Sequence, residues 1–316
     1  NTSHYGFSTS GSDEKTFYKT TTAANGIMFN DKNPYLVDHV VKNSCADLSD
    51  NPIQKNDELI SVDGIKVSRN QNREFYFIRS TDFPDEMTLG FRRGANEFFV
   101  KIHPESYGAM SSQLYEEWIE ANKKRVDALS NNQIGYVYMK DMGEGSLNKF
   151  EKDMVANDVA QKKALILDLR YNTGGNVHDA VLQMLSQKPY LQWKYRDGKM
   201  SPQPNFAPAS KPIILLINEQ TLSDGEMTAA GFKELKLGKI LGNETYHWII
   251  FTTASQLVDG STVRLPSWGC FTPDGKNLEH TGVKPDITVI NTFEDRMQGK
   301  DPQLQAAVEE ILKELK

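Results

Sequence analysis

A serine with the surroundings that nucleophilic catalysis requires lies at position 223. The preceding run, residues 213–218, is short and continuously apolar, which predicts a strand buried on both faces. A polar turn follows, and residues 227–236 have helical spacing. Ser223 would then lie at a helix N-terminus, where backbone N–H groups are unpaired and the helix dipole favours negative charge. Its hydroxyl could attack a carbonyl carbon while those N–H groups hold the developing oxyanion.

The same serine also has a purely structural interpretation. Ser223 and Glu226 have the spacing of a capping box, in which each side chain satisfies a backbone N–H group of the other residue. Such boxes stabilise ordinary helices, so this motif alone does not establish catalysis. A catalytic interpretation needs a base and an oxyanion site from elsewhere in the chain.

A second motif, DLRYNTGGN, occupies residues 168–176 between an apolar strand at 164–169 and a helix predicted near 177–187. The pair Gly174 and Gly175 lets the backbone approach a ligand closely, and its N–H groups can form an anion site. The structural alternative is a tight turn. The motif lacks the lysine of a phosphate-binding loop and is not a dinucleotide-binding GxGxxG sequence.

A serine nucleophile needs a general base, and the chain has six histidines. Lone histidines usually lie in the core or on the surface, so spacing alone does not choose among them. Local sequence favours His178, which is close to the Gly-Gly turn, and His280, which follows Glu279.

The composition restricts the class of protein. The 316 residues are enough for about two domains, and 38% hydrophobic with 25% charged residues is typical of a soluble globular protein. The net charge of −6 argues against nucleic acid as the main partner, and no apolar run reaches the length of a membrane span. Cys45 and Cys270 form no metal-ligand cluster and no disulfide scaffold, and whether they pair stays open. No metal site or cofactor is indicated.

The order of predicted elements divides the chain into four parts. Residues 1–22 are polar, and residues 23–103 contain hairpin signals around Asp63-Gly64 and Gly94. Residues 104–132 include an amphipathic connector helix. In residues 133–316 strands and helices alternate, which predicts an α/β fold with parallel strands, followed by a hairpin near 255–266 and a closing helix near 303–315.

Residues 23–103 resemble a PDZ domain of the type found in bacterial proteases. The sequence KNDELISVDGIKV at 55–67 is similar to their GDxIxxVDGxxV signature, with Asn56 in place of the usual glycine. The resemblance implies that a peptide carboxylate binds the backbone N–H groups of Gly26, Ile27, Met28 and Phe29, with the peptide added to a sheet edge. The alternative is a small β-domain that only packs on its neighbour.

Three motifs, DLRYNTGG, LLINEQTLSDGE and NLEHTGVKPD, occur in this order in tricorn-like proteases, which share a serine peptidase family with the C-terminal processing proteases. The resemblance covers nearly the whole chain. It implies a crotonase/ClpP-like αβ protease core with an inserted PDZ-like domain. It also implies a serine endopeptidase or oligopeptidase that cleaves peptides or unfolded proteins through an acyl-enzyme.

The resemblance assigns roles to four side chains. His4, in a TSH motif at residues 2–4, is similar to the general base of the tricorn branch. It would take the proton of Ser223 during attack and return it to the leaving amine. Ser3 would connect His4 to Glu279, which would stabilise the imidazolium.

The oxyanion hole implied by the resemblance consists of the Asp224 N–H group and one N–H group from Gly174 or Gly175. Each such donor is worth roughly 3 kcal/mol in the transition state. Two features depart from relatives. Trp248 lies where the C-terminal processing branch has a lysine base, so a Ser/Lys dyad is not expected. Residues 192–196 lack the acid with which tricorn selects basic side chains.

A base four residues from a chain end is unusual, because termini fray unless they are held. We therefore expect the native protein to continue upstream. Relatives with PDZ domains are often exported, so the expected location is the periplasm or cell envelope, with the cytoplasm as the alternative. The resemblance also allows a homo-oligomer.

Two other functions stay open on the sequence alone. The chain could be a catalytically silent protein that binds peptides through the PDZ-like segment. It could also be a crotonase-like enzyme acting on acyl thioesters, because that fold also builds oxyanion holes from Gly-rich turns and helix N-termini.

Overall fold

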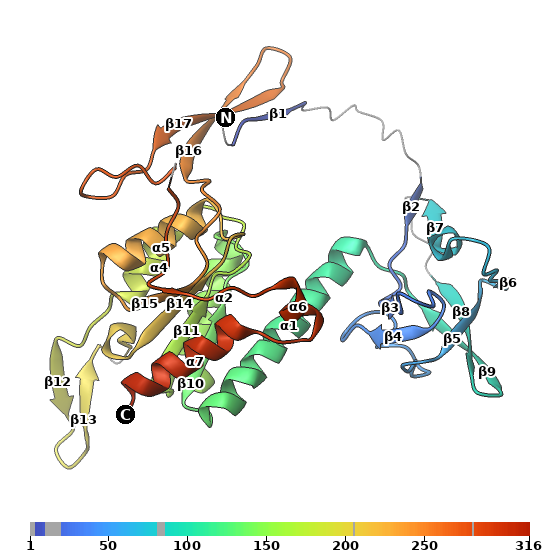
Figure 1. The fold of residues 1–316 in the computed structure, drawn as a ribbon, viewed down its shortest axis with the longest axis horizontal. Helices are drawn as coiled ribbons and strands as arrows, with labels where there is room; N and C mark the ends of the chain where they lie inside the picture. The colour runs from blue at the N-terminus through green and yellow to red at the C-terminus, as the bar shows by residue number, and fades with distance from the viewer. Residues whose placement is uncertain (1–3, 10–19, 81–85, 205, 280) are drawn as a thin grey trace. The chain divides into compact units, whose positions relative to one another are not determined.

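The computed structural model describes residues 4–9, 20–80, 86–204, 206–279 and 281–316 (Figure 1). The chain divides into two compact units, here called the α/β unit (residues 1–12 and 122–316) and the β-rich unit (residues 13–121). Each unit has its own hydrophobic core. Helix α1 (Tyr107–Ser130), which covers most of the predicted connector, begins in the β-rich unit and ends in the α/β unit.

Five parallel strands form the central sheet of the α/β unit, which confirms the predicted α/β class. Every residue of its first three strands is buried, as expected from their continuous apolar sequences. In spatial order the strands are β10 (Ile134–Tyr138), β11 (Ala164–Asp168), β14 (Ile213–Ile217), β15 (Lys239–Gly242) and β18 (Ile287–Thr288).

Helices cover both faces of this sheet. Figure 1 shows α4 and α5 together on one side and α7 on the other. The helical elements of this unit are α2 (Glu144–Val155), α3 (Asn157–Ala160), α4 (His178–Leu185), η2 (Pro208–Ser210), α5 (Asp224–Glu234), α6 (Phe293–Met297) and α7 (Pro302–Glu314). Because β11 and β14 are adjacent and parallel, the turns that lead into α4 and α5 leave the same edge of the sheet.

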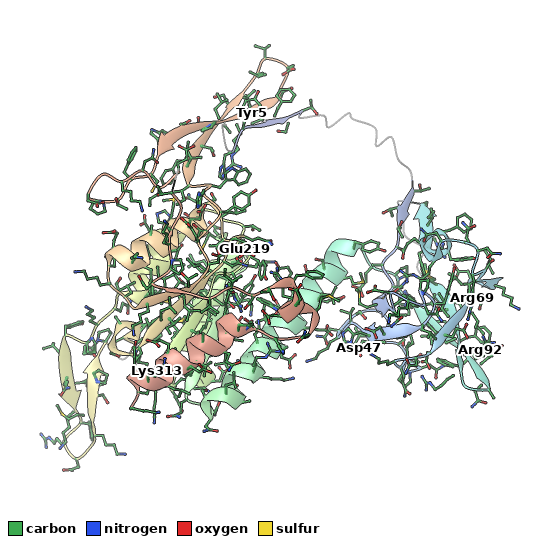
Figure 2. All side chains as sticks on the ribbon, in the orientation of Figure 1. Tyr5, Asp47, Arg69, Arg92, Glu219 and Lys313 are labelled. Atoms are coloured by element: carbon green, nitrogen blue, oxygen red, sulfur yellow. The ribbon has the colours of Figure 1, made fainter. Side chains whose placement is uncertain are left out.

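A second sheet of the α/β unit holds the N-terminal segment. Strand β1 (Gly6–Ser8) pairs antiparallel with β17 (Thr262–Gly269), which in turn pairs with β16 (Ile250–Gln256). Strands β16 and β17 are the hairpin predicted near 255–266. Figure 2 labels Tyr5, which connects His4 to β1. The β1–β17 pairing therefore fixes the backbone next to His4. A further hairpin is formed by β12 (Leu191–Lys194) and β13 (Met200–Gln203).

The β-rich unit contains the hairpins predicted at Asp63-Gly64 and Gly94. Arg69 and Arg92, both labelled in Figure 2, form ion pairs with Glu58 on its four-stranded sheet. Its elements are β2 (Thr20–Thr22), β3 (Ile27–Phe29), β4 (Val37–Val40), β5 (Glu58–Val62), β6 (Ile65–Lys66), η1 (Arg73–Phe77), β7 (Ile78–Ser80), β8 (Met87–Arg93) and β9 (Asn96–Ile102).

A buried ionic network fixes the end of β11 to the closing helix. The Arg170 side chain is 1% exposed and donates to the carboxylates of Asp168 and Asp301 at 2.7–2.9 Å. Asp301 is also the N-cap of α7, where it accepts from the Leu304 N–H group. Burial alone would raise the pKa of Asp301, but its contacts with the Arg170 guanidinium, the Asn291 side chain and the Leu304 N–H group together outweigh burial and hold that pKa below its usual range.

We predict that Asp301→Ala lowers the free energy of unfolding by about 3–5 kcal/mol, because it breaks a buried ion pair. The check is urea unfolding followed by far-UV circular dichroism. Asp295→Ala is the matched control: it removes an exposed cap of α6 and should cost only about 1 kcal/mol. If both variants lost the same free energy of unfolding, the Arg170 ion pairs would not stabilise the fold as we predict.

Candidate active site

Ser223 lies on a strained turn between β14 and α5. Its backbone has φ 54° and ψ −120°, a region that a non-glycine residue adopts only at a cost of about 1–3 kcal/mol. The resulting sharp turn resembles the strand-to-helix elbow that exposes nucleophilic serines in hydrolases. The His4 Nε2 atom is 3.1 Å from the Ser223 Oγ atom, so the hydroxyl can donate its proton to the imidazole.

The predicted capping glutamate does more than cap a helix. The Glu226 side chain is fully buried and accepts the Ser223 N–H group at 3.1 Å. It also accepts the N–H groups of His247 at 2.9 Å and Trp248 at 2.7 Å, and the Thr245 hydroxyl at 2.5 Å. Burial raises the pKa of Glu226, while these four donors favour its charged form. One carboxylate thus joins the nucleophile to the loop that carries Trp248.

Trp248 packs against the candidate base. The ring centroids of Trp248 and His4 are 4.5 Å apart, and those of Tyr246 and Trp248 are 5.5 Å apart. The sequence drew attention to Trp248 only as the residue that replaces a lysine base. In the structure the Trp248 ring packs against the imidazole of His4.

The environment of His4 favours the neutral, proton-accepting form of its ring. Burial is the largest influence and lowers the pKa of His4 below 6.5, and the positive charge of Arg264 lowers it further. The negative charge of Glu279 acts in the opposite direction and raises the pKa, but it is the smallest of the three influences. His4 can therefore act as a base at neutral pH.

The proposed relay through Ser3 stays a prediction, because Ser3 lies outside the described residues. Two observations bear on it. The His4 Nδ1 atom is buried, and none of the described residues forms a hydrogen bond with it. Glu279 is close enough for its charge to act on His4, although no hydrogen bond joins the two side chains in the part of the chain that the structure describes.

The Gly-Gly turn lies directly against the nucleophile. A Cβ atom on Gly174 would be 2.6 Å from the Ser223 Cβ atom and 3.2 Å from the Asp224 backbone nitrogen. The Gly174 N–H group itself donates to the Asn172 side chain at 2.9 Å, so it is not available to an oxyanion. Gly175 is the remaining candidate donor from this turn. The Asp224 N–H group is in the first turn of α5, where helical N–H groups have no carbonyl partner within the helix.

Asn172 is a site residue that sequence reasoning missed. It is fully buried, and besides accepting from Gly174 it donates its side-chain N–H to the Met139 carbonyl at 2.8 Å. Its backbone carbonyl accepts the Leu222 N–H group at 3.0 Å. These bonds tie the Gly-Gly turn both to the end of β10 and to the residue before Ser223. The only sequence signal was its place inside the DLRYNTGGN motif.

The other two histidines favoured by local sequence have different outcomes. His280 lies outside the described residues. His178 begins α4, and its Nδ1 atom is 2.6 Å from an oxygen of the buried Asp224 carboxylate. This contact raises the pKa of His178 above 6.5, against the effect of burial.

The β-rich unit has a cavity of about 400 Å³ beside β3. It is lined by the predicted peptide-binding residues Ile27, Met28 and Phe29, together with Arg73 and Tyr107 among others. The Ile27 N–H group already donates to the Asn25 side chain at 2.9 Å, so it is not open to a carboxylate as the resemblance implied. Gly26 precedes this strand with φ 73°.

The remaining predictions concern thiols, metals and membranes. Cys45 and Cys270 are both free thiols. Burial raises the pKa of Cys45 to about 12 and also raises that of Cys270, so neither is an activated nucleophile. Within the described ranges, no group of three or more His, Cys, Asp or Glu side chains could hold a metal ion. No helix among the described residues is long and apolar enough to cross a membrane.

Comparison with known proteins finds similarity to peptidases. Residues 133–289 match peptidase family S41. Tricorn protease of Thermoplasma acidophilum is 34% identical over 204 residues, which are 64% of this chain and 19% of that protein. Tricorn protease of Thermoplasma volcanium is 29% identical over 298 residues, 90% of this chain and 26% of that protein. The chain therefore spans about a fifth to a quarter of the length of these relatives.

The crystal structure of the tricorn protease superposes with a TM-score of 0.75 at 26% sequence identity. The match covers 96% of this chain and 30% of the tricorn chain.

We predict that Gly174→Ala lowers the rate of any reaction at Ser223 by about 100-fold or more. The added methyl group would overlap Ser223 and displace it, and displacements near 1 Å have costs of this size. The measurement is the rate of Ser223 labelling by a fluorophosphonate. Gly94→Ala is the control, because Gly94 also has positive φ but a methyl group there meets open space. A Gly174→Ala rate equal to that of Gly94→Ala would contradict this geometry.

We predict an acidic limb below pH 6.5 in the pH profile of labelling by the free protein. The lowered pKa means that the basic form of His4 persists below pH 6.5 and is lost as pH falls through that pKa. Arg264→Gln removes an influence that lowers the pKa, so the limb should move to higher pH. Glu279→Gln removes the opposite influence, so the limb should move to lower pH. Shifts in the same direction would show that His4 is not the titrating base.

Proposed function

We propose that this chain, whose residues 133–289 match peptidase family S41, is a serine endopeptidase or oligopeptidase with Ser223 as nucleophile and His4 as general base. The observation that carries this proposal is the 3.1 Å contact between the His4 Nε2 and Ser223 Oγ atoms. The contact joins residues 219 positions apart, through an N-terminal segment held by the β1–β17 pairing. A capping serine has no need of such a partner.

In the acylation step, the Ser223 Oγ atom attacks the carbonyl carbon of a peptide bond, and its proton passes to His4 Nε2. The carbonyl oxygen becomes an oxyanion, which accepts hydrogen bonds from the Asp224 N–H group and the Gly174-Gly175 turn, with Gly175 as the available donor. His4 then gives the proton to the amine nitrogen as the peptide bond breaks. An acyl-enzyme on Ser223 and a free amine are the products.

In the deacylation step, His4 removes a proton from water, whose oxygen attacks the ester carbonyl of the acyl-enzyme. The same donors hold the second oxyanion. Collapse of this intermediate returns the proton to Ser223 and releases a carboxylic acid. Throughout, the Trp248 ring restricts the positions that the imidazole of His4 can adopt.

Ser3 and Glu279 complete the proposed relay. A transient imidazolium on His4 needs a partner at Nδ1, and that atom is buried without one among the described residues. Ser3 is adjacent to His4 in sequence, and the charge of Glu279 acts on the ring. A hydroxyl between imidazole and carboxylate would satisfy Nδ1 and stabilise the imidazolium.

The β-rich unit is proposed to be a PDZ-like module that binds extended peptide at β3, with unfolded proteins as the source of such peptide. The cavity beside β3 supports this role. In this proposal the module binds peptide for a catalytic unit in the same chain. A catalytically silent binding protein is therefore not favoured. The crotonase-like alternative is not favoured either, since the relatives reported above are peptidases.

We predict that a fluorophosphonate probe labels this protein at Ser223 and that Ser223→Ala and His4→Ala both abolish the labelling. Peptide mapping locates the modified residue. Removing either member of a serine–histidine pair typically lowers turnover by about 10⁴–10⁶-fold. Ser112→Ala and His39→Ala are the matched controls, because both residues lie in the β-rich unit and should leave labelling unchanged.

Labelling that persists in a folded His4→Ala variant would move the base to another residue. A folded wild-type chain that takes up no probe would contradict the peptidase proposal itself.

A further inference from the structure

The Asp224 side chain, unlike its backbone, has no role in the mechanism described so far. Its carboxylate is 2% exposed and accepts the N–H groups of Val177 at 2.8 Å and His178 at 3.1 Å. These two groups are at the beginning of α4, and Val177, the N-cap residue of α4, supplies no side-chain cap. A residue of α5 therefore caps α4.

This cap joins the two halves of the oxyanion hole. Helix α5 begins with Asp224, whose N–H group is one oxyanion donor, directly after Ser223. Helix α4 begins at His178, three residues after Gly175, on the side of the other donor. A shift of α4 relative to α5 would change the distance between the donors. The Asp224 carboxylate opposes that shift, because it bonds to the start of α4 from the start of α5.

The His178 ring adds charge to this contact. Its Nδ1 atom is 2.6 Å from Asp224 Oδ1. The attraction between the two groups is strongest when the imidazole is protonated and carries a positive charge. The side chain is 17% exposed, so it can exchange protons with solvent.

We propose that Asp224 and His178 are positioning residues that hold the two oxyanion donors at a fixed separation, and that the pair weakens when His178 loses its proton. This inference rests on the proposed peptidase function. It gives the Asp224 side chain a role separate from that of its backbone N–H group. Its expected signature is a change in the rate of the chemical step at saturating reagent, because the pair does not touch the reagent.

The direction of the pH effect follows from the charges around His178. In the described part of the chain, the charged groups that act on it are Asp224 of α5 and the more distant Asp179 of its own helix. Both raise the pKa of His178, and the Asp224 contact is the largest influence. A group with a raised pKa contributes fully below its ordinary value, and the contribution is lost as pH rises through the raised value. The rate should therefore have an alkaline limb above pH 6.5.

The test measures fluorophosphonate labelling of Ser223 from pH 5 to 10, separating the maximal rate constant from the half-saturating probe concentration. Phosphonylation generates an oxyanion at the same place as peptide cleavage, so no natural substrate is needed. The variants are Asp224→Asn and His178→Asn, which keep the size or a donor of the original side chain but remove its charge. Asp179→Asn is the matched control, since that carboxylate is 96% exposed and 3.6 Å from the other ring nitrogen.

We expect Asp224→Asn to lower the maximal rate constant by about 10- to 100-fold, with the half-saturating concentration changed less than about twofold. His178→Asn should lower the maximal rate several-fold and abolish the alkaline limb, leaving the acidic limb of His4 in place. Asp179→Asn should keep both limbs and the wild-type rate. Circular dichroism and urea unfolding confirm that each variant is folded.

Three results would overturn the inference. The alkaline limb could persist in His178→Asn, which would assign it to another group. A folded Asp224→Asn variant could label at the wild-type rate. The half-saturating concentration alone could change, which would place the pair in probe binding. Failure of the wild-type chain to label would instead overturn the peptidase proposal, so the two failures are distinguishable.

Discussion

The proposed active site depends on a carboxylate buried in the first turn of α5. Glu226 accepts hydrogen bonds from the Ser223 backbone and from the loop at 245–248. It therefore holds both Ser223 and Trp248, whose ring packs against His4. A buried carboxylate is tolerated only when donors surround it, and four donors do so here. The Glu226 half of the capping box is therefore present, and in the proposed mechanism the same carboxylate also positions the catalytic serine.

Different interactions hold the two turns beside Ser223 and the segment that carries His4. The parallel sheet brings the turns after β11 and β14 to one edge, and the Asn172 backbone carbonyl and the Asp224 carboxylate join those turns. The proposed base, His4, belongs to the N-terminal segment, in which β1 pairs with β17. Backbone pairing can thus keep His4 within hydrogen-bonding distance of Ser223 although it lies near the beginning of this chain.

Much of this arrangement could be predicted from sequence, because local patterns carry it. The buried strands, the helix after Ser223 and the hairpins follow from continuous apolar runs and turn residues. The choice of His4 could not be derived from spacing and came from a family resemblance. The roles of Asn172 and of the Asp224 side chain could not be predicted either, because both depend on contacts between turns that are about 45–50 residues apart. The Ile27 amide was predicted to be open, whereas the neighbouring Asn25 side chain occupies it.

The most direct test of the account is a crystal structure of the chain after reaction with a fluorophosphonate. We predict a covalent bond to Ser223 Oγ, with a phosphoryl oxygen roughly 3 Å from the Asp224 and Gly175 nitrogens. The His4 Nε2 atom should remain within hydrogen-bonding distance of the adduct. A phosphoryl oxygen directed away from both nitrogens, or an adduct on another residue, would contradict the proposed site.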